Sequence, residues 1–150
     1  QKKLDIQALG DLDEATFEAN IDLIGDDTLI RRARHAVTEN QRTLEAKAEL
    51  EKGNLEAFGK LLNASHYSLR HDYEVTGIEL DTLVDAAQAQ SGVLGARMTG
   101  SGVVGCAIAV VKEENIPTFK NKVYDKYMEM VGYAPEFYVA HIGSGTTKIG

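Results

Sequence analysis

The stretch "VLGARMTGSGVVGCAIAVV", residues 93–111, places two short apolar runs on either side of a glycine-rich segment. The runs VLGARM (93–98) and GCAIAVV (105–111) contain β-branched residues and are bounded by glycine, as buried strands often are. Consecutive strands joined by a short connection pair antiparallel. The stretch therefore predicts a β-hairpin, around which the rest of the fold is arranged.

Two long helices are expected ahead of this hairpin. Residues 26–52 contain neither Gly nor Pro and are rich in Ala, Leu, Glu, Arg and Gln, which favour a helix. Gly53 suits the position just after a helix, and Asn54 can cap a second helix that runs to about residue 71. Because so short a connection separates them, the two helices should pack as a hairpin.

Three more elements complete the predicted fold. Residues 76–79, TGIE, form a capping-box pattern that would open a helix over 77–90. Pro117 suits the first turn of a helix from 115 to about 130, and EFYVAHI, 136–142, predicts a last strand. Helices followed by strand, strand, helix and strand predict an α+β fold, in which an antiparallel sheet packs against several helices.

The composition excludes several classes of protein. The 150 residues carry a formal net charge of −7, which argues against nucleic acid and anionic membrane surfaces as partners. No apolar run is long enough for a membrane span, and the single cysteine, Cys106, leaves no intramolecular disulfide. A reducing, cytoplasmic location fits best. The first residue is not methionine, which is compatible with a piece of a longer protein.

Gly100, Gly102 and Gly105 spell G-x-G-x-x-G, a spacing found in several nucleotide-binding loops. A dinucleotide fold requires a helix after the glycines, whereas a strand is expected here. A protein-kinase loop does lie between strands, but H-R-D and D-F-G motifs are absent, as is a P-loop G-K-[ST]. Two interpretations remain: a turn that lets backbones approach closely, and a nest in which amides and the Thr99 and Ser101 hydroxyls bind an anion.

Four longer stretches, which together span most of the chain, are more specific than the glycine spacing. They are RRARHAVTEN (31–40), NASHYSLRHDYEVTGIELDTLV (63–84), GVLGARMTGSGVVGCAIAVV (92–111) and FYVAHIGSG (137–145). Together they resemble the C-terminal half of the galactokinases, and GARMTGSG resembles the third signature motif of the GHMP sugar and metabolite kinases. The resemblance implies that residues 1–150 form one GHMP kinase C-terminal domain, an elaborated ferredoxin-like α+β fold.

The resemblance also implies an activity. Galactokinases use ATP and magnesium to phosphorylate the anomeric hydroxyl of galactose, giving galactose 1-phosphate, in the cytoplasmic Leloir pathway of galactose metabolism. Their catalytic residues, magnesium ligands and main phosphate loop lie in motifs of the form G-R-V-N-L-I-G-E-H and P-x-x-x-G-L-S-S-S-A, and neither motif is present in this sequence. These parts would belong to an upstream N-terminal half, the expected partner of this chain. The 150 residues alone are therefore expected to contain no catalytic or metal-binding residue, to bind neither ATP nor magnesium, and to be inactive.

Of the three family motifs, only the third is present in this sequence. Its expected role is to support the nucleotide and the phosphate loop, through Arg97, Thr99, Gly100, Ser101, Gly102 and Gly105. The sequence departs from the family at Val103 and Val104, where an aromatic residue and a glycine are usual, and a β-branched residue is poorly suited to positive φ. This departure leaves open a relative that binds galactose and ATP without catalysis, and a free-standing α+β ligand-binding module is a further alternative.

Other polar residues favour structural interpretations. His66 and His71 lie five positions apart, about 140° around a helix, which does not suit shared metal ligation, so surface or capping positions are expected for both. Cys106 is expected to be a buried, inert thiol. Arg31, Arg32 and Arg34 are expected to form a solvated helix face that is paired with Glu39 and nearby carboxylates. Arg70, Asp72 and Glu74 are expected to form a polar junction between helices.

Overall fold

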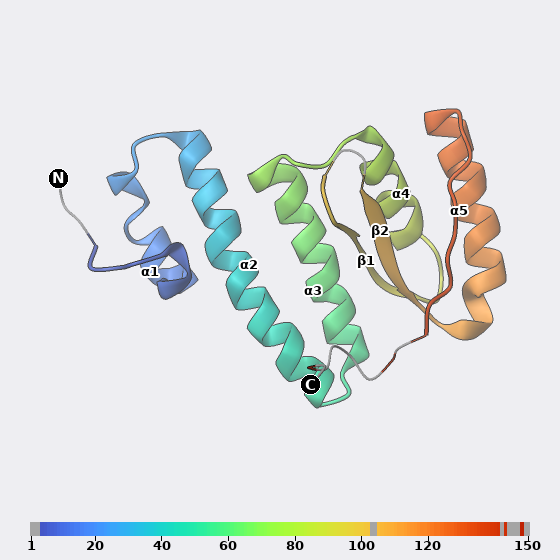
Figure 1. Cartoon of the computed structure of the whole chain (residues 1–150), viewed down its shortest axis with the longest axis horizontal. Helices are drawn as coiled ribbons and strands as arrows, with labels where there is room; N and C mark the ends of the chain where they lie inside the picture. Colours follow the sequence, from blue (N-terminus) through green and yellow to red (C-terminus); the bar gives the residue numbers. More distant parts are fainter. Residues whose placement is uncertain (1–3, 103–104, 142, 144–147, 149–150) are drawn as a thin grey trace.

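The computed structural model describes residues 4–102, 105–141, 143 and 148. Its main helices are α1 (Glu14–Glu18), α2 (Asp27–Glu51), α3 (Leu55–Ser68), α4 (Ile78–Gln88) and α5 (Ile116–Val131), and its strands are β1 (Val93–Thr99) and β2 (Cys106–Val111). Figure 1 shows these elements side by side along the longest axis, from α1 at one end to α5 at the other. No helix in the described segments is both long and apolar enough to cross a membrane.

The predicted helical hairpin of α2 and α3 is confirmed. The Asp26 carboxylate accepts a hydrogen bond from Leu29 N at 2.8 Å to open α2, and Asn54 Oδ1 accepts one from Ala57 N at 3.2 Å to open α3. Gly53 between them has φ +73°, the left-handed conformation that ends a helix. Helix α3 stops at Ser68, short of the predicted end near residue 71, because the chain continues as a π-helical turn, η3 (Leu69–Tyr73).

The predicted β-hairpin is also confirmed, and with it the α+β fold of an antiparallel sheet packed against helices. Strands β1 and β2 pair antiparallel, with Arg97 opposite Ile108 and Thr99 opposite Cys106. Side chains alternate between the two faces of a strand, so Ala96 of β1 shares one face with Ala107 and Ala109 of β2. Helices α4 and α5 cover that face and form a buried cluster with it: Val84, Ala86, Ala87, Ala96 and Val123.

Helix α3 lies against the edge of β1 that does not pair with β2. The amide of Ala96 donates to Asn63 Oδ1 at 2.9 Å, and the amide of Met98 donates to His66 Nδ1 at 3.2 Å. A Cβ added to Gly59 would lie 2.1 Å from the carbonyl oxygen of Leu94, so the helix and strand backbones are in direct contact. The helix thus covers a strand edge and satisfies its amides.

The prediction of a last strand at 136–142 is wrong over the residues described. Residues 136–141 are not part of the sheet, and Ile142 lies outside the described residues. Instead the ring of Phe137 packs edge-on against Phe119 of α5, with ring centroids 6.3 Å apart. In Figure 1 the tail runs beside α5. Among residues 136–141 only Phe137 is half-buried, whereas Val139, two positions on, is exposed.

The predicted capping box at 76–79 is not formed. Helix α4 begins at Ile78, with Gly77 as its N-cap residue in an extended conformation and no side-chain capping bond. Because the helix starts one residue later than a capping box requires, the Thr76 hydroxyl is outside the cap position.

The contact between α3 and β1 predicts a sharp intolerance of any side chain at Gly59. Gly59→Ala should lower the free energy of unfolding by about 2 kcal/mol or more, because its methyl group meets backbone atoms that cannot rotate away. Gly10→Ala is the control, since its Cβ would be 3.8 Å from the nearest atom and should change stability little. Urea denaturation of the three proteins measures the difference. Equal midpoints for Gly59→Ala and the unaltered chain would contradict the close contact.

Candidate functional site

The glycine-rich loop between β1 and β2 is shaped by close backbone contacts. Gly100 has φ +78°, and the amide of Gly105 donates to the carbonyl oxygen of Gly102 at 3.1 Å, closing a turn. A Cβ added to Gly102 would lie 1.9 Å from the carbonyl oxygen of Val75. The glycines therefore permit both a tight turn and the approach of a second segment of backbone. The departure from the family pattern at Val103 and Val104 lies outside the described residues.

Several polar groups of the loop make no hydrogen bond to a described residue. Ser101 is exposed and Thr99 half-buried. The amides of Gly100, Ser101 and Gly102 have no backbone acceptor within the described residues. Successive free amides in a turn, together with hydroxyls, suit the binding of an anion such as a phosphate group. Both interpretations of the glycines, close approach and an anion nest, are compatible with this geometry.

The turn after η3, whose Val75 carbonyl group contacts Gly102, is fixed by ion pairs to α2. Glu74 has φ +55°, and its Oε2 lies 2.6 Å from Arg32 Nη2 and 3.3 Å from Arg31 Nη2. Hydrogen bonds from Arg32 and, to a smaller extent, from Arg31 lower the pKa of the Glu74 carboxyl. Val75 follows directly, so these arginines position the carbonyl group that contacts the loop.

The α2 arginines are paired as expected, but their partners are Glu18 and Glu74 from other elements, whereas Glu39 pairs with Arg42 and Arg97. Arg34 Nε lies 2.6 Å from Glu18 Oε1, which completes a paired face on α2. Arg70 Nε lies 3.2 Å from Asp81 Oδ2, and Arg70 Nη1 lies 3.1 Å from Asp85 Oδ2. The segment after α3 is therefore a polar junction that joins η3 to α2 on one side and to α4 on the other.

Arg97 points from β1 toward the helical hairpin. Its Nη1 donates to Glu39 Oε1 of α2 at 3.1 Å, and its Nε donates to the carbonyl oxygen of Met98 at 2.8 Å. Glu39 also pairs with Arg42 and accepts a hydrogen bond from Ser65 of α3 at 2.5 Å. The charge of Arg97 is thus compensated within the chain, and the side chain connects the strand that leads into the loop to α2 and, through Glu39, to Ser65 of α3.

Two expectations are wrong. His66 was expected at the surface or in a cap, but it is only 3% exposed because α3 places it against the amides of β1. Cys106 was expected to be buried, but it is exposed, since it lies on the sheet face opposite the one covered by α4 and α5. His71 is exposed as expected, with its ring against Tyr67 at a centroid distance of 4.3 Å.

Sequence reasoning missed three residues that support the loop: Asn63, Glu39 and Val75. Asn63 and His66 are three positions apart, which places two hydrogen-bond acceptors on one helix face. That spacing was a usable signal for a polar neighbour, although nothing in the sequence shows that the neighbour is a strand edge. Val75 acts through its backbone, so its residue type carries no signal.

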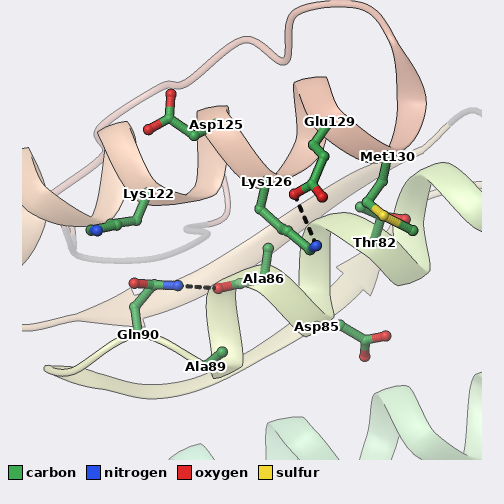
Figure 2. Close-up of a pocket in the computed structure, with 10 residues that line it drawn as sticks. All are labelled: Thr82, Asp85, Ala86, Ala89, Gln90, Lys122, Asp125, Lys126, Glu129 and Met130. Carbon is green, nitrogen blue, oxygen red and sulfur yellow. Dashed lines mark hydrogen bonds and ion pairs between the residues drawn. The ribbon is translucent and has the colours of Figure 1, made fainter.

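A shallow pocket lies elsewhere, between α4 and α5 (Figure 2). Charged residues from both helices line its rim, including Asp85 of α4 and Lys122 and Asp125 of α5. Lys126 Nζ pairs with Glu129 Oε2 at 3.0 Å within it. No described residue of the glycine-rich loop lines this pocket, so it is treated separately from the candidate site.

Comparison with known proteins agrees with the fold and the motif. The family model for the GHMP kinases C terminal matches residues 46–129. Galactokinase of Lactococcus lactis subsp. cremoris is 62% identical over 99% of this chain and 37% of its own length, and galactokinase of Streptococcus thermophilus is 60% identical over 97% and 38%. A crystal structure of Lactococcus lactis galactokinase complexed with galactose superposes with a TM-score of 0.91 at 62% identity, covering 97% of this chain and 38% of that one. The chain thus spans less than two-fifths of the length of these relatives. Since the family model covers more than half of its residues and the fold agrees, the chain belongs to the GHMP kinases and matches their C-terminal domain.

Proposed function

We propose that this chain is the C-terminal domain, residues 1–150, of a cytoplasmic ATP-dependent galactokinase that converts galactose to galactose 1-phosphate. The observation that carries the proposal is the high identity with galactokinases over nearly the whole chain. The partner of the domain is the upstream part that these longer relatives possess and this chain does not contain. The net charge of −7 supports a role without nucleic acid or an anionic membrane surface.

The glycine-rich loop is the contribution of this chain to the active site. The amides of Gly100, Ser101 and Gly102, with the Thr99 and Ser101 hydroxyls, offer donors to the phosphates of ATP or to the phosphate loop of the upstream part. Gly102 and Gly105 keep the loop compact. Arg97 supports it indirectly, because its ion pair with Glu39 fixes the end of β1.

Catalysis and metal binding are assigned to the upstream part. No group of three or more His, Cys, Asp or Glu within the described segments is arranged to hold a metal ion. Magnesium would neutralise charge on the transferred phosphoryl group, and in this proposal its ligands belong to the upstream part while this chain positions the nucleotide. Phosphoryl transfer requires both walls of the cleft, so the isolated chain should not turn over substrate.

A chimera tests whether the chain can complete a galactokinase. This chain would replace the matching C-terminal segment of Lactococcus lactis galactokinase, and galactose-dependent consumption of ATP would be measured. We expect activity within about tenfold of that enzyme, because the interface with the upstream part is shared at this level of identity. The isolated chain should show no turnover. Turnover by the isolated chain would refute the proposal, whereas a folded chimera that binds galactose and ATP without forming sugar phosphate would favour a non-catalytic relative.

Gly102→Ala in the active chimera tests the role of the loop. Its methyl group would collide with the carbonyl oxygen of Val75, so the loop must move away from the turn that η3 provides. We expect kcat/KM for ATP to fall by about tenfold or more, since catalytic donors must be placed to within a fraction of an ångström. KM for galactose should change little, and Gly10→Ala should match the unaltered chimera. An unchanged kcat/KM for ATP would show that the loop is not part of the nucleotide site.

A further inference from the structure

His66 is a buried side chain next to the candidate site, with no role in the mechanism described so far. It is 3% exposed and projects from α3 onto β1, where its Nδ1 accepts a hydrogen bond from the amide of Met98 at 3.2 Å. Met98 is two residues before Gly100, the first glycine of the loop. The imidazole is therefore the last side-chain acceptor on this edge before the chain turns.

The Met98 contact fixes the protonation state of the ring. A backbone amide can only donate, so Nδ1 must present its lone pair, and the proton of the neutral imidazole must be on Nε2. Nε2 lies 3.4 Å from Asp81 Oδ1, and both atoms are buried without a well-formed hydrogen bond to any described residue. The ring is thus hydrogen-bonded on the Met98 side, while its Nε2 faces the Asp81 carboxylate without a well-formed hydrogen bond.

The charges around the ring come from each element packed against it. Asp81 and Asp85 face it from α4, and Arg70 faces it from η3 and pairs with both carboxylates. The charged side chain on β1, Arg97, is paired with Glu39. Burial lowers the pKa of His66 below its usual value, and the carboxylates of Asp81 and Asp85 oppose this effect in part.

We propose that neutral His66 is a positioning residue that holds the end of β1, and with it the glycine-rich loop, in the place required for phosphoryl transfer. This inference rests on the proposed function. A second proton, on Nδ1, would replace the acceptor with a donor that faces the Met98 amide. The two N–H groups repel, so the end of β1 must shift when the ring becomes charged.

Two substitutions of nearly equal shape test the inference in the full-length protein. His66→Asn keeps a carbonyl oxygen near the position of Nδ1, while His66→Leu fills similar space without an acceptor. At pH 7.5, kcat/KM for ATP should fall by about tenfold or more in His66→Leu, and by about threefold or less in His66→Asn, because only Leu leaves the buried amide unpaired. KM for galactose should stay the same in both. His71→Asn, at an exposed position, is the control.

The pH profile separates positioning from simple packing. In the unaltered protein, kcat/KM for ATP should fall reversibly at acidic pH, with a midpoint below the usual pKa of histidine, because burial lowers the pKa of His66. That fall should be absent in His66→Asn, which does not titrate. Equal losses in the Asn and Leu variants, or an acidic fall that persists in His66→Asn, would overturn the inference. If His66→Leu does not fold, the pH profile of His66→Asn decides alone.

Failure of the proposed function gives a different result. An unaltered full-length protein that does not phosphorylate galactose would refute that function, and hydrogen exchange would then test the His66 contact. The peptide containing the Met98 amide should exchange faster in His66→Leu than in His66→Asn at the same pH, because only the latter keeps an acceptor. Equal exchange in the two variants would show that His66 does not hold the strand.

Discussion

The contact between α3 and the open edge of β1 is the interaction on which the rest of the structure depends. In a sheet of two strands, the amides that point to the outer edge of each strand have no partner within the sheet, and buried amides without acceptors are costly. Asn63 and His66 supply those acceptors, and Gly59 lets the helix approach closely enough for them to reach. Through α3, at its edge, β1 is joined to α2, and through one of its faces it packs against α4 and α5, so both ends of the molecule meet at one strand.

The glycine-rich loop is positioned by residues that are far from it in sequence. Arginines of α2 hold Glu74, the residue after Glu74 presents its carbonyl group to Gly102, and Arg97 ties the preceding strand to Glu39. Helix α2 is therefore connected to the loop in two ways: by the ion pairs with Glu74, and by the ion pair between Glu39 and Arg97. These pairs are partly exposed, and each alone contributes little to stability, so their main effect is on geometry.

Local signals were enough to predict the helical hairpin, the β-hairpin and the motif. Caps, a glycine with positive φ and an uninterrupted run of helix formers act within a few residues, so α2, α3 and the strands are found close to where they were expected. The predictions that fail depend on which segments pack together in the folded chain, and local sequence patterns do not show this. Cys106 is exposed because only one face of β2 is covered, His66 is buried because a strand edge needs an acceptor, and the tail packs on Phe119 instead of pairing. The support of Gly102 by Val75 involves a carbonyl group, which every residue type has.

The close backbone contact between Gly59 of α3 and Gly95 of β1 also limits which substitutions this domain can accept during evolution. A Cβ on either residue would lie 2.1 Å from backbone of the other segment, and neither position can shrink to make room for growth at its partner. Compensating pairs of substitutions are therefore excluded, and an outward shift of α3 would break the bonds of Asn63 and His66 together. Residues 59–66 and 94–98 must be inherited, or transplanted into another scaffold, as a single unit.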